Sequence, residues 1–147
     1  MLSDYLNENM IKLQVKAEDW EDAVRQGGKL LIDAGFCEER YVDAMVEAVK
    51  TMGPYMVMAP GLALAHARPE DGVLGLGMSV ITLEAPVEFG SEVNDPVSLI
   101  ISFGGVDHES HIGMLQALAR FLMVEENQDF LRNATSVPEV LDSFKNY

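Results

Sequence analysis

The order of hydrophobic patterns predicts an α/β fold: a mixed β-sheet of about five strands, covered by helices on both faces. Apolar residues recur at helical spacing in residues 20–31 and 41–52. Short apolar runs separated by turn residues follow between residues 55 and 103, and helical spacing returns after Gly105. No repeat, low-complexity tract or linker interrupts this order, so residues 1–147 are expected to form a single domain.

The first third of the chain is expected to hold a short helix, a strand and two longer helices. Ser3 is a candidate N-cap for the short helix. Residues 11–15 alternate between apolar and polar side chains, as in a half-buried strand. Each of the two longer helical patterns is followed by a glycine, Gly35 or Gly53, and glycine commonly ends helices.

Further strands are expected at residues 56–58, 62–67, 73–83 and 97–103, with turn-forming residues between them. A helix is then expected over residues 110–124, followed by a short helical segment around residues 130–131. The last helix has its own start signal, because Ser136 can cap it, Pro138 suits the first turn and Glu139 can complete a capping box.

The composition excludes several classes of protein. Asp and Glu number 24 against 10 Lys and Arg, for a formal net charge of -14, and no basic cluster offers a footprint for nucleic acid. The acidic surface either attracts a basic protein partner or only maintains solubility. Cys37 is the single cysteine, the start lacks a signal-peptide pattern, and no apolar run is long enough to span a bilayer. We therefore expect a cytoplasmic protein that does not insert into the membrane.

Two of the three histidines have positions that suit phosphate chemistry. His66 ends an alternating run, so its imidazole is expected at the end of a strand, just before a loop. His111 heads the apolar stripe of its helix and, with Asp107 as N-cap, lies in the first turn, where the helix dipole favours an anion. A lone histidine at a strand end is more often structural, so neither position decides the function by itself.

The two imidazoles would face each other across a crevice if the strand of His66 ran beside residues 97–103 in the same direction. A neutral imidazole nitrogen is a nucleophile near neutral pH, and a phosphoimidazole can pass its phosphoryl group onward without a metal or another cofactor. The same residues, together with His108, can also be read as metal ligands. Zinc sites, however, usually show a further ligand at a recognisable spacing.

Two segments resemble motifs of a known family. Residues 58–73, MAPGLALAHARPEDGV, are similar to the active-site region of the mannitol/fructose-type IIA superfamily of the bacterial phosphotransferase system, and most closely to its ascorbate-type branch. Residues 110–119, SHIGMLQALA, resemble a second motif of that family, a histidine that opens a leucine-rich helix. Together with the order of elements, the resemblance covers nearly the whole chain.

The resemblance implies a phosphohistidine carrier, a phosphotransferase component that uses no cofactor. It implies that His66 accepts the phosphoryl group from the carrier protein HPr and delivers it to a cysteine of a IIB protein. His111 is implied to be the companion histidine that helps to hold the phosphate. The implied substrate of the whole system is L-ascorbate, taken up by a separate membrane component, IIC, with which this chain has only an indirect link.

Two residues beside His66 bear on this resemblance. Much of the superfamily has a proline before the active histidine, whereas Ala65 here restores a backbone donor and loosens the local dihedral restriction. Arg68 fits the ascorbate-type branch, and it either neutralises phosphate or is a solvated loop charge. Three rival functions stay open: a regulatory IIA-like domain that is phosphorylated as a signal, a small histidine-ligated metalloenzyme, and an interaction module without chemistry.

Overall fold

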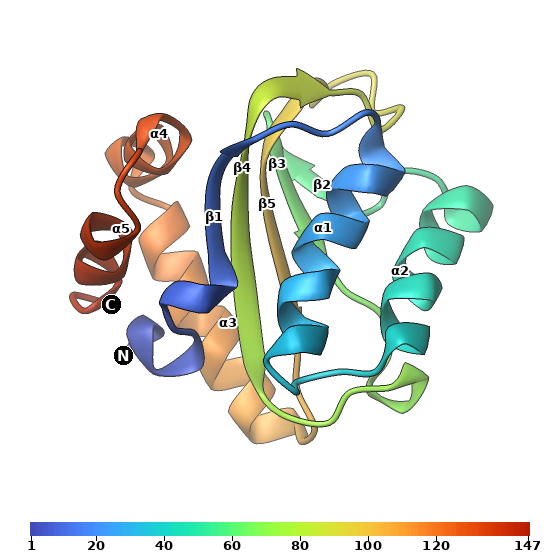
Figure 1. The fold of residues 1–147 in the computed structure, drawn as a ribbon, viewed down its shortest axis with the longest axis horizontal. Coiled ribbons are helices and arrows are strands. Elements are labelled where there is room, and N and C mark those ends of the chain that lie inside the picture. The colour runs from blue at the N-terminus through green and yellow to red at the C-terminus, as the bar shows by residue number, and fades with distance from the viewer.

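The chain folds around a five-stranded sheet in the order β1-β4-β5-β3-β2 (Figure 1). The computed structural model describes residues 1–147, except for the side chain of His108. The strands are β1 (Ile11–Val15), β2 (Val57–Ala59), β3 (Leu62–Ala65), β4 (Gly77–Val87) and β5 (Val97–Gly104). β1 and β4 pair in parallel, as do β3 and β5, whereas β4 with β5 and β2 with β3 are antiparallel. The predicted mixed sheet is confirmed.

Helices cover both faces of this sheet, as predicted (Figure 1). α1 (Trp20–Asp33) and α2 (Glu39–Met52) lie on one side, and α3 (His108–Leu122), α4 (Glu125–Asn133) and α5 (Val137–Phe144) lie on the other. Three short 3-10 turns, η1 (Leu2–Tyr5), η2 (Glu8–Met10) and η3 (Pro69–Asp71), complete the described elements. None of the helices that the structure describes is long and apolar enough to cross a bilayer.

Burial on both faces explains why the central strands appear in the sequence as apolar runs. All but one of the residues of β5 are buried, and so is the first part of β4. A strand covered on both sides has no solvent-facing row of side chains, so the polar half of the usual alternation is missing. By contrast, β1 lies at the edge of the sheet and keeps the alternating pattern that the sequence shows.

Side-chain caps and glycines set several helix ends. At the starts of α1, α3 and α5, the side chains of Asp19, Asp107 and Ser136 each accept a hydrogen bond from the backbone N–H three residues further on. Gly35 and Gly53 follow α1 and α2 with φ angles of 82° and 85°, a region that other residues rarely adopt. The predicted caps at Asp107 and Ser136 and the predicted glycine stops are therefore confirmed.

Two predicted boundaries near the start and the site are wrong. Ser3 does not cap a helix, because it lies inside η1, whose N-cap is Met1. β3 ends at Ala65 instead of continuing to residue 67, because the backbone leaves the ladder with β5 at that point. His66 is therefore the first residue beyond the strand.

The strand predicted to begin at Val73 begins at Gly77. The intervening backbone pairs instead with the loop between α1 and α2, where the N–H groups of Leu74 and Gly75 both donate to the carbonyl of Phe36. Val73 makes only an isolated bridge, with Cys37. The residues before Gly77 thus pair with this loop and do not join the sheet, and Leu74 among them is exposed.

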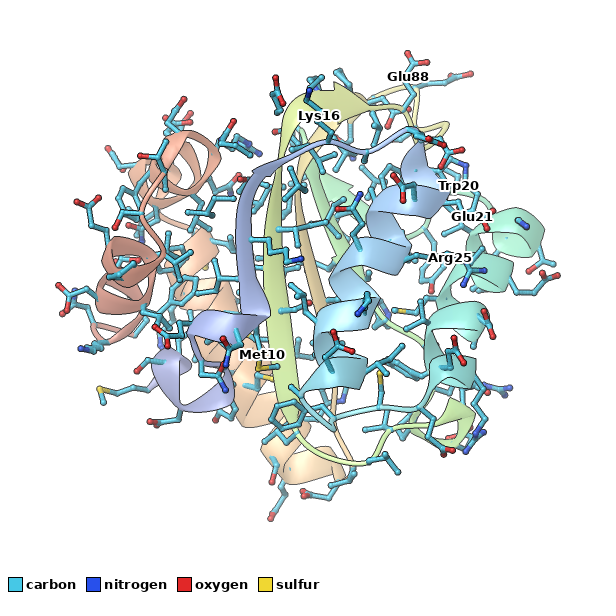
Figure 2. The ribbon with its side chains drawn as sticks, in the orientation of Figure 1. Met10, Lys16, Trp20, Glu21, Arg25 and Glu88 are labelled. Carbon is cyan, nitrogen blue, oxygen red and sulfur yellow. The ribbon has the colours of Figure 1, made fainter. Side chains whose placement is uncertain are left out.

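The contact of α1 with α2 carries an ion-pair network around Arg25, labelled in Figure 2. Its guanidinium donates to Glu21 on the same helix at 3.1 Å and to Asp43 of α2 at 2.8 Å. The hydrogen bond from Arg25, followed by one from Lys50, lowers the pKa of the Glu21 carboxyl. Exposed pairs of this kind add little to stability, so the buried apolar faces of the two helices provide most of the cohesion.

Candidate functional site

A backbone hydrogen bond fixes the ring of His66 just beyond the end of β3. The Nδ1 atom lies 2.9 Å from the carbonyl oxygen of Leu64. Because a carbonyl oxygen can only accept, this contact assigns the ring hydrogen to Nδ1 and leaves the lone pair on Nε2. A nucleophilic Nε2 requires this tautomer. No pattern in the sequence identifies this acceptor, because it is a backbone carbonyl.

Aromatic side chains hold His66 from two directions. The hydroxyl of Tyr55 donates to the carbonyl of His66 at 2.7 Å, and the two rings meet edge to face with centroids 5.6 Å apart. The ring of Phe103, near the end of β5, stacks on the imidazole with centroids 5.1 Å apart and an interplanar angle of 14°. The half-buried imidazole therefore has both its backbone and its ring plane restrained.

His111 lies in the first turn of α3, as the spacing predicted. The helix begins after Asp107, whose side chain accepts from the N–H of Ser110 at 2.9 Å. A Cβ atom at Gly105 would lie 2.9 Å from the Cβ of His111, so the glycine lets the incoming loop pass close to this side chain. The Nε2 atom of His111 is shielded from solvent.

Both histidines pack against the same aromatic ring. β3 and β5 run in the same direction, so the ends that carry His66 and lead to His111 meet at one edge of the sheet. Phe103 stacks on His66 and contacts the ring of His111 with centroids 5.6 Å apart. The parallel arrangement on which the predicted crevice depended is present, and Phe103 lies in contact with both imidazoles.

A groove runs between α2 and the loop after β3, and His66 forms part of its wall. On the helix side it is lined by Ala44, Glu47, Ala48 and Thr51, and on the loop side by residues that include Arg68. The side chain of Arg68 is 76% exposed, and its Nε lies 3.7 Å from Glu70 and 3.6 Å from Asp71. These long, solvated contacts leave the guanidinium able to reorient toward an anion in the groove.

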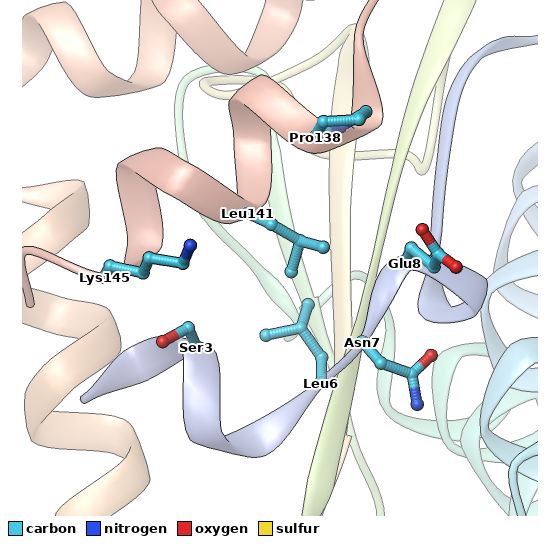
Figure 3. Close-up of a pocket in the computed structure, with 7 residues that line it drawn as sticks. All are labelled: Ser3, Leu6, Asn7, Glu8, Pro138, Leu141 and Lys145. Atoms are coloured by element: carbon cyan, nitrogen blue, oxygen red, sulfur yellow. The ribbon is translucent and has the colours of Figure 1, made fainter.

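A second hollow, between η1 and α5, is shown in Figure 3. Leu6 and Leu141 form its apolar floor, and Lys145 is close to the carboxylate of Asp142 at 3.5 Å. Its described lining includes no histidine or cysteine. Because the hollow between η1 and α5 has no histidine in its described lining, the groove at His66 is the candidate site.

The metal-binding alternative has little support among the described side chains. They include no group of three or more His, Cys, Asp or Glu placed to hold one ion. The side chain of His108, the remaining predicted ligand, lies outside the described residues. The ring of His66 is instead committed through Nδ1 to a backbone carbonyl, an arrangement that leaves a single ring nitrogen for chemistry.

Sequence reasoning missed two tyrosines that contact the backbone around His66. Tyr41 is the first residue of the apolar pattern in residues 41–52, and it is buried, with 1% of its surface exposed. Its hydroxyl nevertheless contacts Ala67 and Phe103 at the ends of the two strands. The only available signal was the choice of tyrosine over phenylalanine on a buried face, because a buried hydroxyl needs a polar partner.

Comparison with known proteins agrees with this geometry. Residues 4–147 match the family described as "Phosphoenolpyruvate-dependent sugar phosphotransferase system, EIIA 2". The chain is 46% identical over 144 residues to the ascorbate-specific PTS system EIIA component of Shigella boydii, covering 96% of this chain and 93% of that protein. The similarity therefore includes the fold and both histidine-bearing segments.

Two solved structures share the fold over almost their full length. The solution structure of the mannitol-specific cryptic phosphotransferase enzyme IIA from Escherichia coli superposes with a TM-score of 0.90 at 37% identity, covering 99% of each chain. A complex of enzyme IIAMTL and phosphorylated enzyme IIBMTL from Escherichia coli gives a TM-score of 0.84 at 30% identity, covering 97% of this chain and 98% of that one. The sheet order and the helix layers are thus those of a known architecture.

Proposed function

This chain belongs to the EIIA 2 family of the phosphoenolpyruvate-dependent sugar phosphotransferase system, and we propose that His66 is the residue on which it carries the phosphoryl group. The observation that supports this assignment is the 2.9 Å contact between Nδ1 of His66 and the carbonyl of Leu64. It leaves the lone pair on Nε2 of a residue that lines the groove beside α2.

In the first step, the Nε2 lone pair of His66 attacks the phosphorus of a phosphohistidine on the donor, for which we propose HPr. A bond from Nε2 to phosphorus forms while the donor's nitrogen–phosphorus bond breaks, and the donor ring leaves with the electron pair. The ring of His66 gains positive charge in this step. The Leu64 carbonyl dipole stabilises that charge through the hydrogen on Nδ1.

In the second step, the thiolate of a IIB cysteine attacks the same phosphorus. A sulfur–phosphorus bond forms, the bond to Nε2 breaks, and the imidazole recovers its lone pair. Nδ1 keeps its hydrogen throughout, so the ring returns to its starting tautomer. The proposal of a IIB partner is supported by the solved complex of enzyme IIAMTL with phosphorylated enzyme IIBMTL, to which this chain is similar.

Two further side chains have proposed roles toward the phosphoryl group. His111 lies at the start of α3, where the helix dipole favours negative charge, and it shares the Phe103 ring with His66. Arg68 lies on the groove wall with only long contacts to Glu70 and Asp71, so its guanidinium can turn toward the incoming phosphate.

We propose L-ascorbate as the sugar of the system and the cytoplasm as the location of this chain. The ascorbate assignment is supported by 46% identity to a protein named as an ascorbate-specific EIIA component. The acidic side chains of Glu47 and Asp71 on the groove wall, together with the net charge of -14, favour partners with basic docking surfaces. Transport itself is proposed to occur through a separate membrane component.

The test is phosphoryl transfer from phosphoenolpyruvate through enzyme I and HPr, with intact mass and acid lability measured on the product. The wild-type protein should gain one acid-labile phosphate, and His66→Ala should gain none while keeping its fold. His111→Ala is the matched histidine control, because it should be labelled more slowly at the same site. Full labelling of His66→Ala would refute the assignment.

The choice of acceptor is tested with the phosphorylated protein alone. Addition of purified IIB protein for ascorbate should remove the phosphate rapidly and place it on a cysteine, whereas the IIB protein for mannitol should remove it slowly. Equal rates with both would contradict the ascorbate assignment. Retention of the phosphate with every IIB protein would instead favour the regulatory IIA-like function.

A further inference from the structure

The hydrogen-bonded ladder between β3 and β5 ends next to His66, the proposed site of phosphoryl transfer. The last paired residues are Ala65 and Ser102, and beyond them β3 gives way to the loop that starts at His66 while β5 continues to Gly104. Beyond this last pair, two polar backbone groups lie where the strands separate. They are the N–H of Ala67 and the carbonyl of Phe103. A buried strand end of this kind needs another partner for each of them.

The hydroxyl of Tyr41 bridges these two groups. The N–H of Ala67 donates to it at 3.0 Å, and the hydroxyl donates to the carbonyl of Phe103 at 2.7 Å. The carbonyl of Ala67 lies within reach at 3.3 Å as a second acceptor. One phenolic group of α2 thus takes the place of a further rung between the strands.

The bridge lies in a dry environment. Tyr41 is among the largest fully buried side chains, with 1% of its surface exposed, so water does not compete for either hydrogen bond. Burial raises the pKa of the Tyr41 phenol to about 12, so the hydroxyl keeps the proton that it donates at neutral pH. The arrangement is therefore fixed under the conditions in which the protein acts.

Both ends of the bridge belong to residues that adjoin His66. Ala67 is the next residue in the chain, so its amide fixes the peptide unit that follows the nucleophile. Phe103 supplies the ring that stacks on His66 at 5.1 Å and contacts His111 at 5.6 Å. A change in the separation of these two backbones would move the imidazole relative to the aromatic surface on which it rests.

We propose that Tyr41 is a positioning residue for phosphoryl transfer, holding the backbone after His66 against the backbone of Phe103 so that the imidazole keeps its reactive orientation. The inference rests on the proposed role of His66. Tyr41 acts through the two backbones and does not touch the phosphoryl group. Because it belongs to α2, which forms one wall of the groove, it also links the docking wall to the nucleophile.

The test compares Tyr41→Phe with wild type in transfer from phosphorylated HPr, at a temperature where both are fully folded. The turnover number should fall roughly 10- to 100-fold, the loss expected when a reacting group is misplaced by a fraction of an ångström to about 1 Å. The KM for phosphorylated HPr should stay unchanged, because the groove surface is intact. The ring ¹⁵N resonances of His66 should shift or broaden as the imidazole gains freedom.

Tyr147→Phe is the matched control. It also removes one phenolic hydroxyl from a hydrogen bond, in this case one donated by Asn127 at 3.0 Å, near the C-terminal end of the chain. It should leave the turnover number and the resonances of His66 at their wild-type values. A wild-type turnover number in Tyr41→Phe, or an effect on KM alone, would overturn the inference.

A measurement on the wild-type protein applies even if Tyr41→Phe does not fold. The amide of Ala67 should resist hydrogen exchange as strongly as amides inside β3, although it lies in a loop. Exchange at the rate of an open loop would overturn the bridge. Absence of any label on wild-type His66 would instead refute the proposed function, so the two failures are distinguishable.

Discussion

A close contact between α1 and the middle of the sheet makes the effect of one added methyl group predictable. A Cβ atom at Gly27 would lie 2.8 Å from Oγ of Ser102 and 3.8 Å from Oγ of Ser79. The first distance is shorter than any normal contact, and the second is ordinary. Ser79 donates to the carbonyl of Gly27 at 2.8 Å, whereas Oγ of Ser102 is buried without a hydrogen-bond partner among the described residues.

The expected energies follow from these contacts. Gly27→Ala gains about 1 kcal/mol of helix propensity but costs about 1–3 kcal/mol through overpacking, for a net destabilisation of about 1 kcal/mol. Ser102→Ala removes an unsatisfied buried hydroxyl and should stabilise the protein by about 1 kcal/mol. In the double variant the clash is absent, so its free energy of unfolding should exceed that of the wild type by about 2 kcal/mol. The coupling energy between the two substitutions is then about 2 kcal/mol.

Urea unfolding of the wild type, both single variants and the double variant measures this coupling, provided that the m-values agree. Gly27→Ala combined with Ser79→Ala is the control, because that serine is not the clashing group and its loss removes a hydrogen bond. The control should show no rescue. The reasoning would be refuted if the energies of Gly27→Ala and Ser102→Ala were additive. It would also be refuted if the Gly27→Ala single variant were more stable than the wild type.

Two further predictions concern pH and a loop far from the site. Burial raises the pKa of Tyr41 from 10.0 to about 12, so its stabilising contribution is complete below pH 10 and is lost between about pH 10 and 12, as the unfolded chain releases the proton first. The loss is about 3 kcal/mol, at about 1.4 kcal/mol per pH unit. Measured by urea unfolding across this range, the free energy of unfolding should fall less in Tyr41→Phe than in wild type. Equal declines would contradict the prediction. The carboxylate of Asp95 accepts hydrogen bonds from the N–H groups of Phe89, Gly90 and Ser91 at 2.8 to 3.1 Å. Asp95→Ala should therefore destabilise the protein by about 2–3 kcal/mol in urea unfolding without slowing phosphoryl transfer. Slower transfer would contradict this and show that the loop is energetically coupled to the site.

Much of the fold could be predicted because its signals are local. Helical spacing in residues 20–31 and 41–52 corresponds to α1 and α2, and the capping pattern at Ser136 corresponds to the start of α5. Asp107 was assigned as an N-cap for the same reason, since a cap and the N–H groups that it satisfies are near neighbours in sequence. These predictions required no knowledge of the tertiary structure.

The errors arose where distant backbone segments decide the outcome. Residues 73–76 have the apolar character of a strand, but the N–H groups of Leu74 and Gly75 donate to the carbonyl of Phe36, in the loop between α1 and α2, and not to a strand. Sequence composition does not encode which of two partners is closer. The same limitation explains why β3 was predicted to be longer than it is.

The positions of the two candidate histidines were predictable, but the contacts that hold them were not. His66 and His111 were selected from strand-end and helix-start positions, and the parallel pairing of β3 and β5 brings those positions to one edge. The supporting contacts lack such signals. Tyr41 and Phe103 are 62 positions apart, and the acceptor at Leu64 is a backbone carbonyl, a group that every residue carries.

The hydrogen on Nδ1 of His66 also determines the kinetic order of the proposed relay. Because that nitrogen is occupied by the Leu64 carbonyl, Nε2 must both take and give the phosphoryl group, and donor and acceptor must use the same groove in turn. On the proposed function, a productive complex with both partners bound is not expected. Double-displacement kinetics are therefore predicted, with parallel double-reciprocal plots and inhibition at high concentrations of either unphosphorylated partner.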